Sequence, residues 1–438
     1  MNPGEQIYQN YMNILKEELV PATGCTEPIA VAYAAAKARE VLNAVPESCI
    51  IAASGNIIKN VKSVVVPNTN GLKGIKAAAA AGIVAGDASK KLEVLADIEE
   101  KAKASIQGYI DAHPITVAPA DNDIVFYIAA TVKKGNNEAT VVIEQYHTNI
   151  VRITRNEKVL YESGSGSDEG GGLTDRSRLT VRDILDFATS VRLEDISEVI
   201  GRQVTFNSAV SEEGLTHEWG ANIGKVLLRA YGNDIKTRAR AAAAAGSDAR
   251  MGGCEKPVVI VSGSGNQGMT ASLPVIEYAR ELRVSRDKLY RALVLSNLVT
   301  IYQKTGIGRL SAYCGAVSAG CGAGAGIAYL QGGDYEDIAH TIVNALAITS
   351  GIICDGAKPS CAAKISSAVD AGILGYHMYK NNQQFFGGDG IVTKGVDNTI
   401  HNVGILAKKG MRQTDREIIN IMLEHTSKDA VADEQNET

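Results

Sequence analysis

The sequence predicts an α+β fold, in which an N-terminal mixed α/β region precedes a mainly helical C-terminal bundle. Two observations carry this prediction. Alternating runs rich in β-branched residues gather between residues 48 and 154, whereas most segments beyond residue 173 have helical spacing. The Gly/Ser-rich stretch 163–172 separates the two patterns and is typical of a linker. We therefore expect one α+β domain at 1–162 and a helical domain at 173–438.

The N-terminal part is expected to begin with two helices over residues 5–44 that pack on the helical domain. They are broken at "PATGCTEP" (21–28), where two prolines flank the break. Residues 48–66 alternate well enough for strands, and an Asn-Gly turn with a helix of small residues follows at 68–86. Further strands are predicted at 123–131 and 138–154, joined by the turn "KKGNN".

The C-terminal part is predicted to be helical apart from "KPVVIVSGSGNQGMTAS" (256–272), a short apolar run with a Gly-rich turn. The longest uncharged run, 310–333, is mostly Gly, Ala, Ser and Cys, so it is interpreted as a buried helix rather than a membrane span. The predicted helices are 180–191, 195–212, 219–232, 236–246, 271–282, 285–304, 314–330, 335–350, 361–379 and 412–425.

Composition and charge exclude several classes of function. Hydrophobic residues make up 45% and charged residues 21% of the 438-residue chain, which is the balance of a soluble globular protein. The net charge of −5 offers no basic field to nucleic acid or acidic lipid, so we expect neither partner. The first twenty residues form an amphipathic helix rather than a signal peptide, which favours a cytoplasmic protein.

Seven cysteines give the strongest chemical signal. In a reduced compartment, an odd set of thiols favours metal binding or catalysis over a disulfide framework. Cys314 and Cys321 lie seven apart in a helical segment, about 10.5 Å along its axis, which favours helix packing for this pair. Cys354 and Cys361 have the same spacing, but a glycine and a proline break the helix between them, so a loop can bring both sulfurs to one centre.

Cys314, at the start of a predicted helix, is a candidate third thiolate, because a helix N-terminus lowers the pKa of a thiol. Three thiolates suit either a structural metal with an outside fourth ligand or a [4Fe–4S] cluster with one open iron. From spacing alone, inert core cysteines and a redox disulfide remain alternatives. Cys25 lies in a polar helix break where a thiol can act as base or nucleophile, or can simply fill a turn.

The Gly-rich turn at Ser262–Asn266 offers backbone N–H groups to a carboxylate or phosphate. It is similar to the loop that holds the substrate carboxylate in pyridoxal-phosphate lyases. That chemistry needs a Schiff-base lysine, and none of the upstream candidates has the usual context: Lys59, Lys62, Lys73 and Lys76. Glu27 and Asp355 adjoin cysteines and His147 lies beside a predicted strand, so each is a weak acid/base candidate against a plain structural role.

Four motifs together resemble the iron–sulfur L-serine dehydratase alpha-chain superfamily, and most closely its L-cysteine desulfidase branch. They are "PATGCTEP", "GSGNQGM", "YCGAVSAGCGAGAG" and "CDGAKPSCAAK", and they cover nearly the whole chain in order. The resemblance implies that Cys314, Cys354 and Cys361 hold a [4Fe–4S] cluster and that Cys25 is the proton acceptor. It also implies that the segment around Ser264 lies close to the active site. The substrate-binding candidates are Thr23, Thr26, Ser264, Asn266 and Gly268.

Two departures from the serine dehydratases favour the desulfidase branch. "PATGCTEP" replaces their "SSHT-x-GP" segment, and the second and third ligand cysteines lie closer together in this chain. The resemblance therefore implies a lyase that acts on a small amino acid and converts L-cysteine to hydrogen sulfide, pyruvate and ammonia. A homodimer is expected from the Gly/Ala-rich, helical character of the chain. The alternatives are an L-serine dehydratase and a cluster-free binding or structural protein on the same fold.

Overall fold

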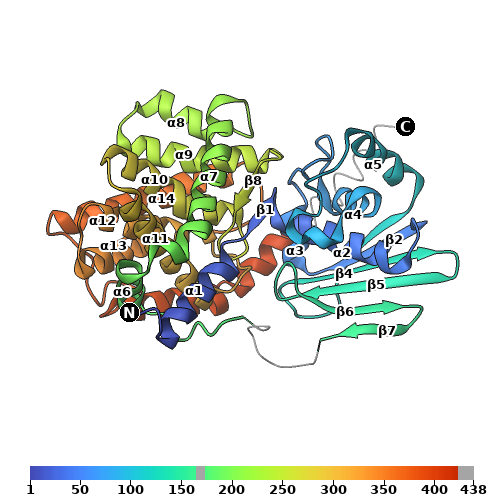
Figure 1. Ribbon diagram of the computed structural model, residues 1–438, viewed down its shortest axis with the longest axis horizontal. Coiled ribbons are helices and arrows are strands. Elements are labelled where there is room, and N and C mark those ends of the chain that lie inside the picture. The colour runs from blue at the N-terminus through green and yellow to red at the C-terminus, as the bar shows by residue number, and fades with distance from the viewer. Residues whose placement is uncertain (164–172, 423–438) are drawn as a thin grey trace.

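The computed structural model describes residues 1–163 and 173–422, and it confirms the α+β prediction. Two lobes lie side by side: a sheet with its helices, and a larger helical lobe (Figure 1). All but the first residue of the predicted linker 163–172 falls outside the described residues. The boundary between domains 1–162 and 173–438 stays a prediction.

The sheet lobe is a six-stranded mixed sheet in the order β3-β2-β4-β5-β6-β7, with only β2 and β3 parallel. Its helices α2 and α4 lie on one face of the sheet (Figure 1). The strands are β2 Ser48–Ala53, β3 Ile115–Pro119, β4 Tyr127–Lys134, β5 Asn137–Glu144, β6 Ile150–Arg155 and β7 Lys158–Glu162. The helices are α2 Thr26–Leu42, α3 Gly55–Val61, α4 Gly74–Ala85, the 3₁₀ helix η1 Ala88–Glu93 and α5 Glu100–Ala112.

The prediction of strands throughout 48–66 is wrong in its second half. The strand ends at Ala53, and Ser54 caps the helix α3, which ends at Val61. A short run such as "NIIKNV" fits strand and helix periodicity almost equally well, so the pattern alone does not separate them. The helix α5 and the strand β3 after it had no counterpart in the sequence prediction.

The helical lobe surrounds one central helix, α12 (Gly315–Leu330), which is buried on nearly all sides. Its glycines allow close approach: a methyl group on Gly320 would lie 2.4 Å from the carbonyl oxygen of Ala368 in α14. Most predicted helices of this lobe are confirmed within four residues at each end. The helix α9 ends five residues later than predicted, α10 begins six residues earlier, inside the segment 256–272 that was predicted to be non-helical, and α15 was missed. The remaining elements are α1 Gln6–Glu18, α6 Val181–Ser190, α7 Leu193–Thr216, α8 Ile223–Tyr231, α9 Ile235–Met251, α10 Gly265–Glu281, α11 Arg286–Ile307, α13 Tyr335–Thr349, α14 Cys361–Lys380, α15 Val396–Ile405 and the π-helical η2 Leu406–Gly410.

Two segments from opposite ends of the chain tie the lobes together. The strand β1 (Pro21–Thr23) pairs antiparallel with β8 (Pro257–Val259). The final described helix, 412–422, reaches the sheet lobe, where Asp415 accepts a 2.6 Å hydrogen bond from Lys59 of α3. The predicted helix 412–425 is therefore confirmed to residue 422, and 423–425 fall outside the described residues. The candidate site lies at this junction.

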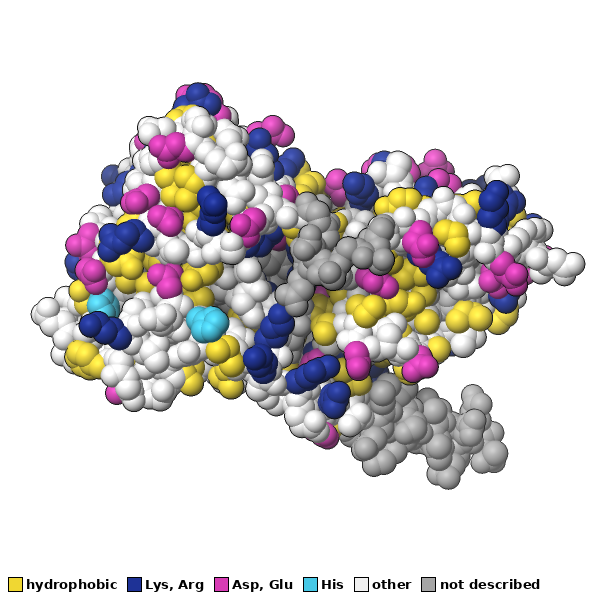
Figure 2. Space-filling model, turned by 90° about the horizontal axis from the view of Figure 1, so that it is seen from below, with side chains coloured by type: hydrophobic (Ala, Val, Ile, Leu, Met, Phe, Trp, Pro, Cys, Tyr) yellow, Lys and Arg dark blue, Asp and Glu magenta, His cyan; other side chains and the backbone are white. Residues whose placement is uncertain are grey.

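Surface charge and helix hydropathy add two observations. Side chains of both charge signs are interspersed over both lobes on the face that Figure 2 shows. Among the described helices, none combines the length and the apolar character that a membrane crossing requires. The uncharged run 310–333 instead supplies the buried helix α12.

Candidate functional site

The turn between β1 and α2 presents Cys25 at the junction of the lobes. Gly24 has a φ of +71°, and a methyl group there would lie 2.6 Å from Pro67, so only glycine fits this turn. Cys25 follows as the N-cap of α2 and is 1% exposed. "PATGCTEP" thus turns the chain sharply and buries a thiol at a helix N-terminus.

Cys25 donates a hydrogen bond to a buried carboxylate. Its Sγ lies 3.2 Å from Oε2 of Glu27, while Asn60 of α3 donates to Oε1 at 3.1 Å. The hydroxyl of Thr26 lies 3.1 Å from the same Oε2 and 2.8 Å from the carbonyl oxygen of Gly263, to which it donates. The turn before α2 is therefore joined through one hydroxyl to the Gly-rich turn before α10.

The charges around this pair set its protonation. Burial, and then the nearby carboxylate of Glu27, raise the pKa of Cys25 well above its ordinary value. Burial also raises the pKa of Glu27, but His147, the Cys25 hydrogen bond and Arg250 together lower it further. Burial lowers the pKa of His147 to about 4, so its imidazole is neutral at pH 7. At neutral pH, Cys25 is therefore a thiol and Glu27 a carboxylate, so the resting protein has no thiolate at Cys25 that could act as a base.

The Gly-rich turn is held in place by Arg250, a buried residue near the end of α9. Its Nε donates to the carbonyl of Gly24 at 3.0 Å, and its Nη1 donates to Oδ1 of Asn266 at 3.2 Å. Ser264 caps α10, with its side chain accepting from the Gln267 N–H. Arg250 and Gly263 therefore link the turn before α2 to the turn before α10. These two turns carry four of the candidates, namely Cys25, Thr26, Ser264 and Asn266.

Two other candidates have structural partners. The N–H of Gly268 donates to the Ser264 carbonyl, and a methyl group on Gly268 would lie 2.0 Å from the carbonyl oxygen of Val259. Close packing on β8 therefore accounts for this glycine. Thr23 is buried in β1 opposite Pro257. Substrate contact by either residue stays a prediction.

Cys314 and Cys354 are held side by side by backbone hydrogen bonds. The N–H of Cys314 donates to the Ile352 carbonyl at 3.1 Å, and the N–H of Cys354 donates to the Ala312 carbonyl at 2.6 Å. Cys314 is the N-cap of α12, as the sequence predicts. Cys361 begins α14 after the broken loop, with its Sγ 3.6 Å from the carbonyl oxygen of Gly356.

The three thiols are close enough to interact electrostatically. Burial raises the pKa of Cys314 to about 12, and Cys354 and Cys361 add to the effect. The lowered thiol pKa predicted from the helix N-terminus is therefore wrong, because burial outweighs the helix dipole. Burial lowers the pKa of Lys304 to about 8, against the opposing influence of Cys354 and Cys314. In contrast, Cys321 lies about two helical turns further along α12 and is fully buried, and burial alone raises its pKa. Cys314, Cys354 and Cys361 thus form one partly exposed group, which we call the thiol centre, and Cys321 is not part of it.

The donor set of the thiol centre suits a cofactor held by thiolates. It presents three soft sulfur donors, with lysine cations nearby that offset thiolate charge. Within residues 1–163 and 173–422, no three or more His, Cys, Asp or Glu side chains are already drawn together as ligands of a single metal ion. A cluster of several atoms spans more space than one ion does. The chemistry of the three sulfur donors fits an iron–sulfur group.

The thiol centre lies close to Cys25. A small apolar cluster of Cys25, Val64 and Met251 packs against Ala357 and Cys361. A methyl group on Gly315, the residue after Cys314, would lie 2.6 Å from the Gln267 side chain. The sequence predictions did not include Arg250, and they weighed Lys59 only as a Schiff-base lysine. The roles of both residues depend on contacts with residues far away in the chain.

Comparison with known proteins agrees with the four motifs. The model of the family described as serine dehydratase alpha chain matches residues 89–420. A UPF0597 protein of Desulfitobacterium hafniense is 60% identical over 98% of this chain and 99% of its own length. Similar proteins of Lachnoclostridium phytofermentans and Treponema denticola are 51% and 46% identical, each over 95% of this chain and 100% and 98% of their own lengths. The chain belongs to the serine dehydratase alpha-chain family.

Proposed function

We propose that the protein is an iron–sulfur-dependent lyase that eliminates the β-substituent of L-cysteine, giving hydrogen sulfide, pyruvate and ammonia. The observation that carries this proposal is the packing of Cys361 against the apolar cluster that contains Cys25, which puts an acid/base pair near the three thiols. Family membership supports the lyase class. The choice of L-cysteine rests on the resemblance of "PATGCTEP" to the desulfidase branch.

Cys314, Cys354 and Cys361 would hold the cluster as thiolates. When bound, a [4Fe–4S] cluster with one iron free of protein ligands supplies a Lewis acid that favours a soft sulfur substituent. Cys314 and Cys361 each lie at a helix N-terminus, where the helix dipole favours negative charge. The backbone bonds around Ile352 and Ala312 hold two of the thiols in register before any cofactor arrives.

Cys25 and Glu27 would act as one proton acceptor. Because the pKa of the thiol is raised and that of the carboxylate is lowered, the resting pair is a thiol and a carboxylate. Cys25 would therefore take the α-proton only as its own proton passes to Glu27, against this pKa difference. The 3.2 Å hydrogen bond already aligns this transfer. The same proton is then available to the leaving group, so no net proton is left on the protein.

The N-termini of α2 and α10 would orient the substrate carboxylate. Thr26 joins the two turns, and Arg250 fixes their relative position by bonding to Gly24 and Asn266. Backbone N–H groups at a helix start attract an anion, which removes rotational freedom before proton transfer. The two turns thus act together as one binding element.

L-Serine is the second candidate substrate, because the matching family model is that of the serine dehydratases. A cluster-free binding protein is the third candidate. Anaerobic reconstitution with iron and sulfide separates the three. The proposal predicts visible cluster absorbance and release of sulfide, pyruvate and ammonia from L-cysteine faster than ammonia release from L-serine. A higher kcat/KM for L-serine would select the dehydratase, and a folded protein that takes up no cluster would select the binding protein.

The ligand assignment has a matched control within one helix. Cys314→Ser and Cys361→Ser are expected to lose the cluster absorbance and the activity. Cys321→Ser, which changes the fully buried thiol of α12, is expected to keep both. Equal cluster loss in all three variants would contradict the assignment. We also propose a cytoplasmic protein and a homodimer, which cell fractionation and sedimentation would test.

A further inference from the structure

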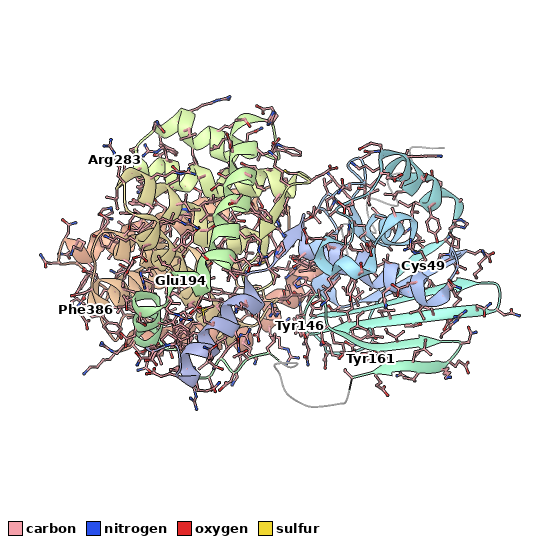
Figure 3. All side chains as sticks on the ribbon, viewed as in Figure 1. Cys49, Tyr146, Tyr161, Glu194, Arg283 and Phe386 are labelled. Atoms are coloured by element: carbon pink, nitrogen blue, oxygen red, sulfur yellow. The ribbon has the colours of Figure 1, made fainter. Side chains whose placement is uncertain are left out.

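A cavity of about 300 Å³ lies between the lobes, next to the candidate site. Its wall includes Tyr146, His147 and Gly263, together with parts of α1 and η1. Figure 3 shows the labelled Tyr146 at the junction of the sheet lobe with the helical lobe. The volume equals that of about ten water molecules, so the cavity has room for a small polar molecule.

The charges on the cavity wall are balanced. Three acidic and three basic residues line it: Glu17, Glu18, Glu93, Lys90, Lys91 and Arg309. Some are paired with each other, since Arg309 bonds to the buried carboxylate of Glu18 at 3.1 Å. A wall with both signs suits a zwitterion better than a phosphate or a dicarboxylate, which would need a net positive field.

Among the described residues, His147 brings an unpaired ring nitrogen to this wall. The side chain is 4% exposed, and its Nε2 is buried without a hydrogen bond among the described residues. The rings of Phe126 and His147 pack in a T-shaped arrangement with their centroids 4.7 Å apart, which restricts rotation of the imidazole. A buried polar atom without a partner costs free energy, so an unpaired nitrogen on a residue that lines the cavity is a candidate contact for a ligand.

His147 also stands between the cavity and the site. A methyl group on Gly263 would lie 2.8 Å from Cε1 of His147 and 3.2 Å from Nη1 of Arg309, so both side chains border that residue. The carbonyl of Gly263 accepts the hydrogen bond from Thr26, which adjoins Glu27. A molecule in the cavity is therefore separated from Glu27 by His147 and one turn of backbone.

We propose that this cavity binds a zwitterionic α-amino acid on its way to the thiol centre and that His147 contacts the amino acid there. The inference rests on the proposed function, because it names where that substrate is first held. Arg309 and His147 flank Gly263 at the inner end, where the carboxylate lies. Glu93 offers oxygen acceptors to the ammonium group at the cavity wall, whereas the carboxylates of Glu17 and Glu18 are already bonded to Arg176.

The binding test uses the reconstituted wild-type protein and L-alanine, which has no β-leaving group and so is not consumed. With ¹⁵N in the histidine rings only seven residues contribute signals, and His147→Gln assigns the relevant pair. L-Alanine is expected to shift the His147 ring signals in a saturable way and to leave those of His113 unchanged. Unshifted His147 signals at L-alanine concentrations far above the substrate KM would overturn the inference.

The kinetic test narrows the cavity without touching Cys25, Glu27 or the thiol centre. Thr148→Phe, on the cavity wall, is expected to raise KM by about tenfold with kcat and cluster absorbance nearly unchanged. His147→Gln is expected to lower kcat/KM by about tenfold or more, and His113→Gln to change nothing. If no amino acid is cleaved but His147 still responds to L-alanine, the proposed reaction fails and the binding site stands. If L-cysteine is cleaved but its KM is unaltered in Thr148→Phe, the proposed reaction stands and the proposed binding site fails.

Discussion

Sγ of Cys25 donates to Oε2 of Glu27 across 3.2 Å, and both side chains are almost completely removed from water. The thiol is therefore the proton donor of the pair in the resting state, although the family resemblance makes it the proton acceptor. The two statements agree if Glu27 receives the thiol proton as Cys25 receives the proton from the substrate. In the proposed reaction, this relationship makes Glu27 as important as Cys25.

Glu27→Gln is expected to lower kcat by about 10²–10⁴-fold, because the amide cannot take the thiol proton from Cys25. The Gln side chain keeps the shape of Glu27 and can still accept from Asn60. Cluster absorbance should therefore remain. The measurement is steady-state release of ammonia and sulfide from L-cysteine. Glu40→Gln, near the other end of the same helix, is the control, and wild-type kcat in Glu27→Gln would contradict the relay.

Stability is expected to fall as the pH drops from 7 to 5, and His147 contributes part of the fall. The unfolded chain binds a proton at this histidine below about pH 6.5, whereas the folded protein excludes it until the pH reaches about 4. The unfolded state thus carries more protons in this window, and the lost stability between pH 7 and pH 5 is about 2 kcal/mol.

Urea unfolding at several pH values measures this contribution. His147→Gln should flatten the pH dependence of the unfolding free energy between pH 7 and 5, whereas His113→Gln should leave it as in the wild type. An unchanged slope in His147→Gln would show that this imidazole takes up its proton without hindrance in the folded protein.

The pair of Lys59 and Asp415 is expected to be important for the stability of the junction. The side chain of Lys59 is 1% exposed, so Asp415→Asn leaves its ammonium group buried without a carboxylate. Loss of one member of such a pair costs about 3 kcal/mol or more, which a urea titration would detect. The exposed pair of Lys37 and Glu40 is the comparison, where Glu40→Gln should cost less than about 1 kcal/mol. Equal losses in the two variants would mean that Lys59 reaches water.

Gly320→Ala is expected to destabilise the protein by about 1–3 kcal/mol, because the added methyl would overlap the Ala368 carbonyl oxygen in α14. The shift between α12 and α14 would also move Cys314 relative to Cys361, so cluster occupancy after reconstitution should fall with thermal stability. Gly108→Ala, on the open face of α5, meets nothing within 4 Å and should stabilise by about 0.5–1 kcal/mol. An unchanged free energy of unfolding in Gly320→Ala would show that α12 and α14 separate slightly at little cost.

The thiol centre was predictable from sequence because its signals are local. The proline and glycine between Cys354 and Cys361 break the helix within a span of eight residues, and Cys314 directly precedes a helix of small residues. In contrast, Arg250 bonds to Gly24 across 226 positions, and no local pattern marks an arginine for such a contact. His147 was weighed as an acid/base, but only the fold reveals that it is buried beside Gly263.

The fold was predictable where periodicity lasts and failed where it is short. The long helices of the C-terminal lobe repeat their apolar spacing over four turns or more, whereas α3 has only seven residues. The sequence did carry a signal there, since Ser54 precedes the helix as an N-cap residue does, and it was outweighed by the apolar pair Ile57 and Ile58.

The bond between Lys59 and Asp415 joins residues that are 356 positions apart. At ordinary rates of translation, the lysine leaves the ribosome about 20–70 s before its partner is made. Until Asp415 is made, Lys59 in the sheet lobe lacks the carboxylate with which it forms a buried ion pair in the finished protein. This contact between the lobes forms only when synthesis is almost complete. A nascent chain that stalls before residue 415 would contain all three cysteines of the thiol centre. It would lack the ion pair between Lys59 and Asp415 that joins the two lobes.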